Sequence, residues 1–143
     1  MVYIFFVIAF VIFALSFLHL HLNIPDIEIT RQVHEAAYEG DALNVKIGIK
    51  NRRGLAAYFF ELFDCYPGAL PDEEKKSLFI LNLEAKETIR ASYITNCYKR
   101  GVWRLGPISI IAQDALGFFK SKKSFDIFSE IIIYPGFFRI FSL

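Results

Sequence analysis

The chain has 143 residues, enough for one domain of ordinary size. Its formal net charge is +1, and its basic clusters, such as those at 46–53 and 120–123, are short, so we expect no nucleic-acid partner. The sequence contains no glycine-rich phosphate loop, nucleophile elbow or metal-ligand spacing. We therefore expect no catalytic residues, no cofactor, no metal site and no small-molecule substrate.

The N-terminus is apolar: residues 1–25 contain none of the 16 basic and 15 acidic residues. A helix of twenty residues is about 30 Å long, which matches the hydrocarbon thickness of a bilayer. We therefore expect residues 1–22 to form a transmembrane helix that contacts the lipid bilayer through residues 1–20. The alternative is a signal peptide, which requires a basic start and a small-residue cleavage site. The sequence has neither, and this favours the retained helix.

The position of basic residues suggests an orientation for that helix. The Lys and Arg residues near the membrane all follow the helix, beginning with Arg31. By the positive-inside tendency, we expect the domain after the helix to be cytoplasmic.

After the helix, apolar residues recur with the period of a β-strand. In residues 43–50, Leu43, Val45, Ile47 and Ile49 alternate with Asn44, Lys46, Gly48 and Lys50, as in an antiparallel sheet with one wet face. Residues 57–66 are apolar on both faces and suit a central strand. We expect seven strands, at 27–33, 43–50, 57–66, 77–83, 88–98, 102–112 and 125–134.

These seven short strands predict an all-β fold for residues 26–135, an immunoglobulin-like antiparallel β-sandwich, with an open barrel as the alternative. Residues 99–101 are expected to form a hairpin turn, and Gly106 with Pro107 a kink or bulge. The strand at 77–83 carries Phe79, Leu81 and Leu83 on one face.

A few polar or reactive side chains remain to be placed. Cys65 and Cys97 match no metal or redox motif; we interpret them as small hydrophobic residues of the core, with a disulfide as the alternative in an oxidising compartment. His19 and His21 end the helix, and His34 lies in a turn. The side chain of Asp114 is expected to accept hydrogen bonds from nearby backbone N–H groups.

Residues 100–135 contain four motifs in a fixed order: an Arg-Gly turn, a Leu-Gly-Pro, an Asp-Ala-Leu-Gly-Phe-Phe bend and a strand ending in Tyr-Pro. Upstream lie a Gly-Asp turn and a strand ending in Asn. This order resembles the N-terminal region of the bacterial family called domain of unknown function 58. The residues that carry the resemblance are Gly40, Asp41, Asn51, Arg100, Gly101, Leu105, Gly106, Pro107, Asp114, Gly117, Phe119, Tyr134 and Pro135.

The resemblance implies structural roles for these residues and no catalysis. It implies a membrane-anchored accessory module that binds protein partners, a MoxR-type AAA+ ATPase or a von Willebrand factor A protein, in an assembly or maturation system. It also implies a location in the bacterial cytoplasmic (inner) membrane, which the one apolar helix expected at residues 1–22 would cross in a single pass. A module of this kind should have an exposed edge strand or an apolar patch on its sandwich.

The chain also departs from the family pattern. Family members have two membrane helices and continue beyond Tyr-Pro into a motif rich in Gly, Arg and Asp-Trp, whereas this sequence ends in an apolar tail at 136–143. The alternative hypothesis is therefore an N-terminal fragment, truncated in this tail, of a longer protein whose activity lies in the missing C-terminal part.

Overall fold

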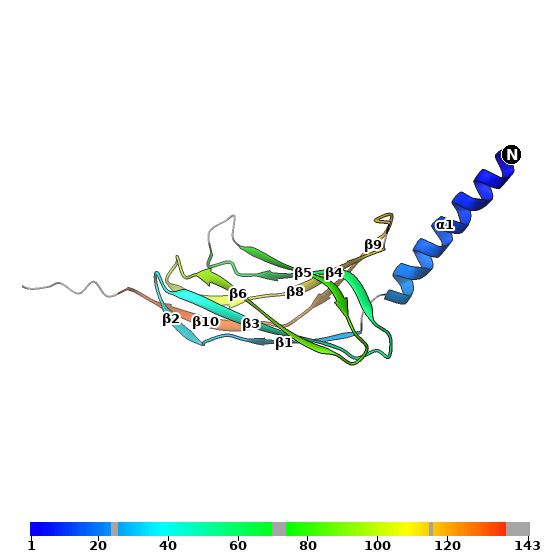
Figure 1. The fold of residues 1–143 in the computed structure, drawn as a ribbon. Coiled ribbons are helices and arrows are strands. Elements are labelled where there is room, and N and C mark those ends of the chain that lie inside the picture. The colour runs from blue at the N-terminus through cyan, green and yellow to red at the C-terminus, as the bar shows by residue number, and fades with distance from the viewer. Residues whose placement is uncertain (24–25, 70–73, 115, 137–143) are drawn as a thin grey trace, which may run out of the picture.

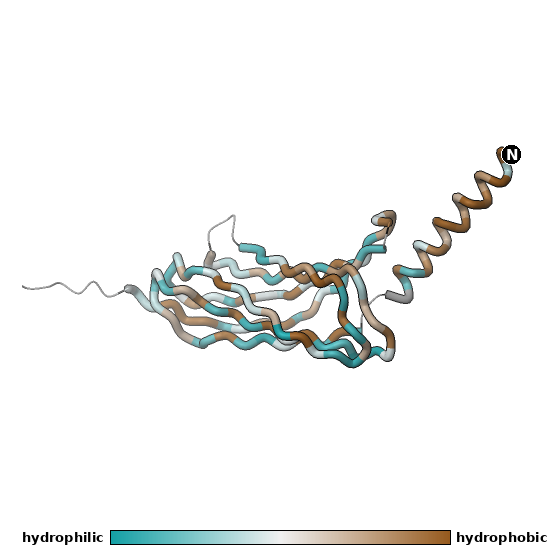
Figure 2. The backbone as a smooth tube through the Cα atoms, in the orientation of Figure 1, coloured by the Kyte–Doolittle hydropathy of each residue, from teal (hydrophilic) through white to brown (hydrophobic). Residues whose placement is uncertain are grey.

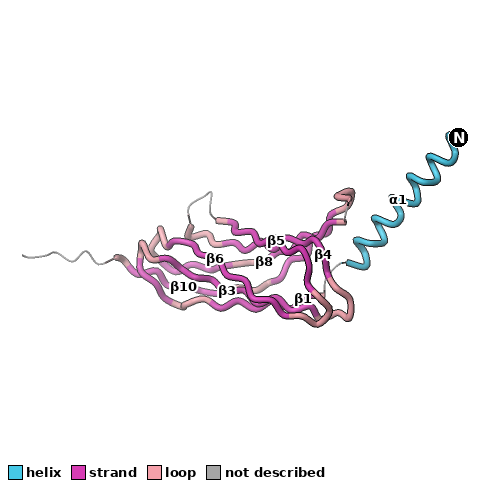
Figure 3. Tube along the Cα trace, in the orientation of Figure 1, coloured by secondary structure: helices cyan, strands magenta, loops and turns pink. Residues whose placement is uncertain are grey.

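The computed structural model describes residues 1–23, 26–69, 74–114 and 116–136, and consists of one long helix followed by a β-sandwich (Figure 1). The helix α1 (Val2–Asn23) projects from one end of the sandwich (Figure 3). The strands are β1 (Ile27–Gln32), β2 (Ala36–Tyr38), β3 (Ala42–Asn51), β4 (Ala57–Cys65), β5 (Lys75–Leu83), β6 (Thr88–Asn96), β7 (Gly101–Leu105), β8 (Ile108–Gln113), β9 (Lys120–Phe125) and β10 (Ser129–Tyr134).

The strands form two layers. One layer is the sheet β1-β3-β6. The other contains the sheets β5-β4-β8-β9 and β2-β10-β7, which are joined because β7 runs into β8 and β9 runs into β10. All strand pairs are antiparallel except β2 with β10, which are parallel. The expected all-β fold behind an apolar N-terminal helix is therefore confirmed, and the layers fit a sandwich.

The core lies between the two layers. Leu43, Val45, Ile47 and Ile49 of β3 are 0–2% exposed, and the alternate residues of that strand face solvent or are half-buried. Burying a side chain of this size contributes roughly 1.5–3 kcal/mol. The expected face of this strand is confirmed, and the alternation of apolar and polar residues is visible along the strands in Figure 2. The opposite layer contributes Phe60, Leu62, Ile108, Ile110, Ile131 and Ile133.

The expected count of seven strands is not confirmed, since the described residues form ten. The segment expected at 102–112 is interrupted at Gly106 and Pro107, and its halves β7 and β8 belong to different sheets. Gly106 has φ +112°, and an added Cβ would lie 2.3 Å from the carbonyl oxygen of Ile127. The basic cluster at 120–123 lies in β9.

The hairpin turn predicted at residues 99–101 was also wrong. Residues 99–101 do not close a hairpin: β6 belongs to one layer and β7 to the other, so the chain crosses between layers there. Period-two alternation identifies a strand but not its partner, because a strand of either layer buries one face.

The face of β5 also differs from the sequence prediction. Phe79 and Leu81 are 56% and 63% exposed, whereas Ile80 and Leu83 are buried. The alternation breaks beside Phe59 of β4, whose φ of +51° lies in the left-handed region that non-glycine residues rarely adopt. Both paired strands therefore change face at this position.

The helix and the β-domain expected from the sequence can both be located in the structure. The helix predicted at 1–22 is present as α1, and its segment Val2–His21 is long and apolar enough to cross a membrane. The described strands extend from Ile27 at the start of β1 to Tyr134 at the end of β10. Of the tail predicted at 136–143, only Gly136 lies within the described residues.

Candidate interaction surfaces and a buried polar network

The terminal strand β5 carries the most apolar outer surface of the sheet β5-β4-β8-β9. Phe79 and Leu81 lie two residues apart and point outward. Across the sheet, Phe79 pairs with Glu61 of β4, and Glu61 pairs with Ile111 of β8. A shallow cavity of about 360 Å³ on this outer face is lined by Phe63, Asp64, Cys65, Lys75, Pro107, Ser109, Ile111 and Lys122. We call Phe79 and Leu81 the β5 patch.

Inside the sandwich, Arg31 of β1 and Asp64 of β4 form an ion pair whose side chains are both fully buried. The Arg31 Nε donates to Asp64 Oδ2 at 3.1 Å, and a second guanidinium nitrogen donates to Asp64 Oδ1. The remaining nitrogen donates to the carbonyl oxygens of Leu105 (3.1 Å) and Ile127 (3.2 Å) and, at 3.4 Å, to the Ser129 hydroxyl. One guanidinium therefore connects β1 to β4, β7 and the start of β10.

Tyr93 of β6 completes this network by donating its hydroxyl proton to Asp64 Oδ2 at 2.7 Å. Burial raises the pKa of Tyr93, and the neighbouring Asp64 carboxylate raises it further, so the phenol stays protonated and remains a donor. The network satisfies the buried charges with hydrogen bonds from both layers. Its role is structural, since its charged side chains are not accessible to a ligand.

Sequence reasoning missed this pair, although a signal for it was present. Arg31 continues the inward face of Ile27 and Ile29, and Asp64 continues the inward face of Phe60 and Leu62. Opposite charges at inward positions of two facing strands are explained by an ion pair between the layers. Arg31, the first basic residue after the helix, is therefore buried against Asp64 in the folded domain.

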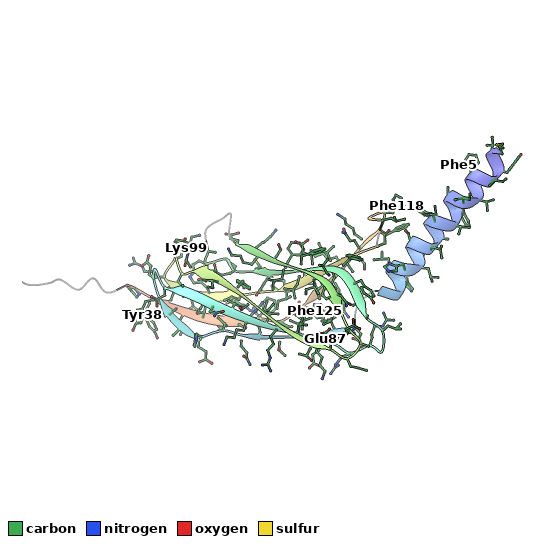
Figure 4. The ribbon with its side chains drawn as sticks, viewed as in Figure 1. Phe5, Tyr38, Glu87, Lys99, Phe118 and Phe125 are labelled. Carbon is green, nitrogen blue, oxygen red and sulfur yellow. The ribbon has the colours of Figure 1, made fainter. Side chains whose placement is uncertain are left out.

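The bend between β8 and β9 contacts the helix. The ring of Phe119 lies 4.7 Å from that of Phe13 and 5.6 Å from that of Phe17, measured between centroids. The ring of Phe118 lies 6.4 Å from that of Phe13. Figure 4 shows Phe118 beside α1. We call Leu116, Phe118 and Phe119 the hairpin tip.

Asp114 organises this tip as its sequence position predicts. Its carboxylate accepts hydrogen bonds from the backbone N–H groups of Phe119 (2.7 Å) and Leu116 (3.2 Å), and from the Ser16 hydroxyl of the helix. Burial would raise the pKa of Asp114, but these donors outweigh burial and lower it. Asp114 is therefore a charged group that ties the tip to the helix.

The residues that carry the family resemblance do not meet in one site. Gly40, Asp41, Arg100, Gly101, Tyr134 and Pro135 lie in turns or strand ends at the end of the sandwich remote from the helix (Figure 1). There the backbone N–H of Tyr38 donates to the Asp41 carboxylate at 3.0 Å, and the rings of Tyr38 and Tyr134 lie 5.9 Å apart.

The other motif residues lie in the middle of the sandwich or near the helix. Leu105 is buried and, with Gly106 and Pro107, forms the crossing between sheets. Asp114, Gly117 and Phe119 form the bend beside α1. The buried Asn51 donates its amide to the carbonyl oxygens of Leu55, Leu83 and Glu84, so it connects two loops. These contacts are structural.

The cysteines and histidines do not assemble a reactive centre in the described part of the chain. Cys65 is half-buried and Cys97 is buried, both are free thiols, and burial raises the pKa of each. Their interpretation as small core-associated residues fits this placement. His34 is exposed. No group of three or more His, Cys, Asp or Glu side chains that could hold a metal occurs among the residues described.

No protein-family model matches the chain, and no curated protein matches it. Among the solved structures with similar folds are two of one CARDB domain. The crystal structure of the CARDB domain of the PF1109 protein from Pyrococcus furiosus, in complex with di-metal ions, has a TM-score of 0.55 and 13% identity and covers 80% of this chain and 97% of that chain. The solution NMR structure of the same domain has a TM-score of 0.52 and 13% identity, with 77% and 95% covered.

At this identity the likeness concerns the fold alone. It places the domain among β-sandwich modules with the CARDB arrangement of strands. The described residues therefore comprise an apolar helix, whose segment Val2–His21 is long and apolar enough to cross a membrane, followed by a β-sandwich.

Proposed function

We propose that this protein is a non-catalytic, membrane-anchored β-sandwich module that binds a protein partner along the edge of β5. The observation that carries the proposal is the β5 patch, two large apolar side chains exposed at alternate positions of a terminal strand. Soluble domains seldom leave such an edge uncovered, because it can pair with another chain.

A comparison of the terminal strands favours β5. The outer edge of β9 carries Lys120, Lys122 and Lys123, and lysines discourage strand pairing. The solvent face of β1 is polar. The strands β6 and β7 carry exposed Ile94 and Val102, but only one large exposed apolar residue each. In the described chain, β5 alone among these strands combines a terminal position with two such residues.

The mode of binding that fits this edge is the addition of an extended segment of the partner to the sheet. Backbone hydrogen bonds with β5 would supply affinity, and alternate apolar side chains of the segment would pack on Phe79 and Leu81. The exposed Lys75 at the start of β5 favours a segment with an acidic residue at that end.

The identity of the partner is proposed from the sequence resemblance to the domain of unknown function 58 family. The proposed partner is a MoxR-type AAA+ ATPase or a von Willebrand factor A protein. The helix α1 would hold the complex at the bacterial cytoplasmic membrane. An ATPase partner requires ATP, so the sandwich would lie on the cytoplasmic side.

Binding can be measured with the full chain in lipid nanodiscs and a purified MoxR-type ATPase or von Willebrand factor A protein from the same organism. Leu81→Asp should weaken binding at least about tenfold, because it places a charge in the apolar contact. The matched control is Val102→Asp, which changes a residue 67% exposed on another terminal strand and should leave affinity unchanged. Equal affinities for the wild type and Leu81→Asp, or no binding of either protein, would contradict the proposal.

A further inference from the structure

The hairpin tip is an exposed apolar surface that the β5 proposal does not use. Leu116 is 57% exposed and Phe118 is 60% exposed, at the end of the β8–β9 hairpin next to α1. We propose that the hairpin tip enters the lipid bilayer beside α1 and forms a second membrane contact of the protein. This inference rests on the membrane anchoring in the proposed function and adds a lipid-binding element to it.

The first argument is the level of the tip along the helix. Phe119 packs between Phe13 and Phe17. These residues precede His21, the end of the apolar segment, by eight and four positions. At 1.5 Å per residue, the contacts lie about 12 and 6 Å from that end. If the segment Val2–His21 spans the hydrocarbon layer, the tip beside it lies within the same layer.

The second argument is the hydrogen bonding of the tip. Backbone in hydrocarbon is stable only where its polar groups are satisfied within the protein. The N–H groups of Asp114 and Gly117 donate to the carbonyl oxygens of Phe119 and Asp114, at 3.2 and 3.0 Å. Those of Leu116 and Phe119 donate to the Asp114 carboxylate. Four N–H groups of this short bend therefore need no water.

The third argument is the way in which the charge of Asp114 is enclosed. Asp114 is 2% exposed, and Ser16, which supplies a hydroxyl to it, is 7% exposed. Most side chains of the helix are exposed, whereas Ser16 is covered by its contact with Asp114. The arrangement hides the one charged group of the tip from the surroundings and leaves the apolar side chains outward.

The surroundings of the tip fit a lipid environment. A cavity of about 250 Å³ between helix and tip is lined by Ile12, Leu15, Ser16, His19 and Leu116, and an acyl chain would fill it. The exposed Lys120, Lys122 and Lys123 follow the tip along β9. At about 3.3 Å per residue, Lys122 and Lys123 lie about 10 and 13 Å along the strand from Phe119, far enough to reach the headgroup region and contact lipid phosphates.

The test uses tryptophan fluorescence of the full chain in phosphatidylcholine vesicles whose acyl chains carry bromine, which quenches tryptophan on contact. The wild type has one tryptophan, Trp103. Its indole donates to the carbonyl oxygen of Lys99 at 2.7 Å, and Lys99 lies at the end of the sandwich remote from Phe118 (Figure 4). We expect no quenching of the wild type. Two variants are made in a Trp103→Phe background: Phe118→Trp reports on the tip, and Phe10→Trp reports on the helix.

Both reporters should lose most of their emission in brominated vesicles. Phe10→Trp should be quenched most by bromine near the chain ends, and Phe118→Trp by bromine nearer the headgroups. If Phe10→Trp is quenched and Phe118→Trp is not, the tip proposal is overturned and the membrane anchor stands. If neither is quenched, the anchor and the proposed function fail together. Circular dichroism confirms that each variant is folded, and a Phe118 variant with a native spectrum but no quenching would count against the tip.

Discussion

Arg31 and Asp64 show how two charged residues hold a sandwich together. Their charges are removed from water, which is costly, and this cost is offset by mutual attraction and by the hydrogen bonds from Arg31 and Tyr93. Removal of either partner would leave the other charge buried without compensation. The chain also contains an exposed pair, Arg52 with Glu28 at 3.0 Å, in which the side chains are 60% and 43% exposed.

We therefore predict opposite outcomes for two similar substitutions. Arg31→Met should lower the free energy of unfolding by about 3–5 kcal/mol, because it strands the Asp64 carboxylate in the core. Arg52→Met should lower it by no more than about 1 kcal/mol, because its partner remains hydrated. Urea unfolding of the detergent-solubilised full chain, followed by Trp103 fluorescence, measures both. Equal losses in the two variants would mean that the buried pair is not intact in solution.

The strand β3 is the element in which sequence and structure agree most closely. Its apolar residues alternate over the whole strand, and its neighbours β1 and β6 cover both edges. The terminal strand β5 agrees least. It has apolar residues on both faces, and the left-handed Phe59 in the paired strand changes which of them point inward.

The register of β3 gives a direct prediction. Ile47→Asp should unfold the domain, because Ile47 is 0% exposed and the new carboxylate would be buried without a partner. Lys46→Asp, on the solvent face of the same strand, should change the free energy of unfolding by no more than about 0.5 kcal/mol. Circular dichroism during thermal unfolding compares the two. Comparable damage from both substitutions would show that the strand faces are assigned incorrectly.

Among the described residues, the helix contacts the hairpin tip through Phe13, Ser16 and Phe17, and its buried Leu20 belongs to the core cluster. The β5 patch and the tip are separate surfaces. The proposed arrangement therefore keeps the partner-binding edge available while the tip and α1 occupy the bilayer.

The anchor itself can be tested by placing a charge in the helix. Phe10→Asp should shift the protein from the membrane fraction to the soluble or aggregated fraction, because an acidic residue at the centre of a membrane helix costs about 2.5–3.5 kcal/mol. Val102→Asp, at the remote end of the sandwich, should leave the distribution unchanged. Immunoblots of membrane fractions after alkaline extraction report the outcome. A wild-type protein released by alkaline extraction would contradict membrane anchoring.

Local pattern was sufficient to predict the apolar helix, the all-β domain and the inner face of β3, because each depends on side chains close together in the chain. The hydrogen bonding of Asp114 was also predictable, since the backbone N–H groups of Leu116 and Phe119 that donate to its carboxylate lie within five residues of it. The β5 patch could not be predicted: it depends on which strand is terminal and on a backbone distortion in the paired strand. The partners of Arg31 lie 33 to 98 positions away. Only the stacking of two layers brings those residues together. The proposed second lipid contact likewise depends on the tertiary contact that places the hairpin tip beside α1.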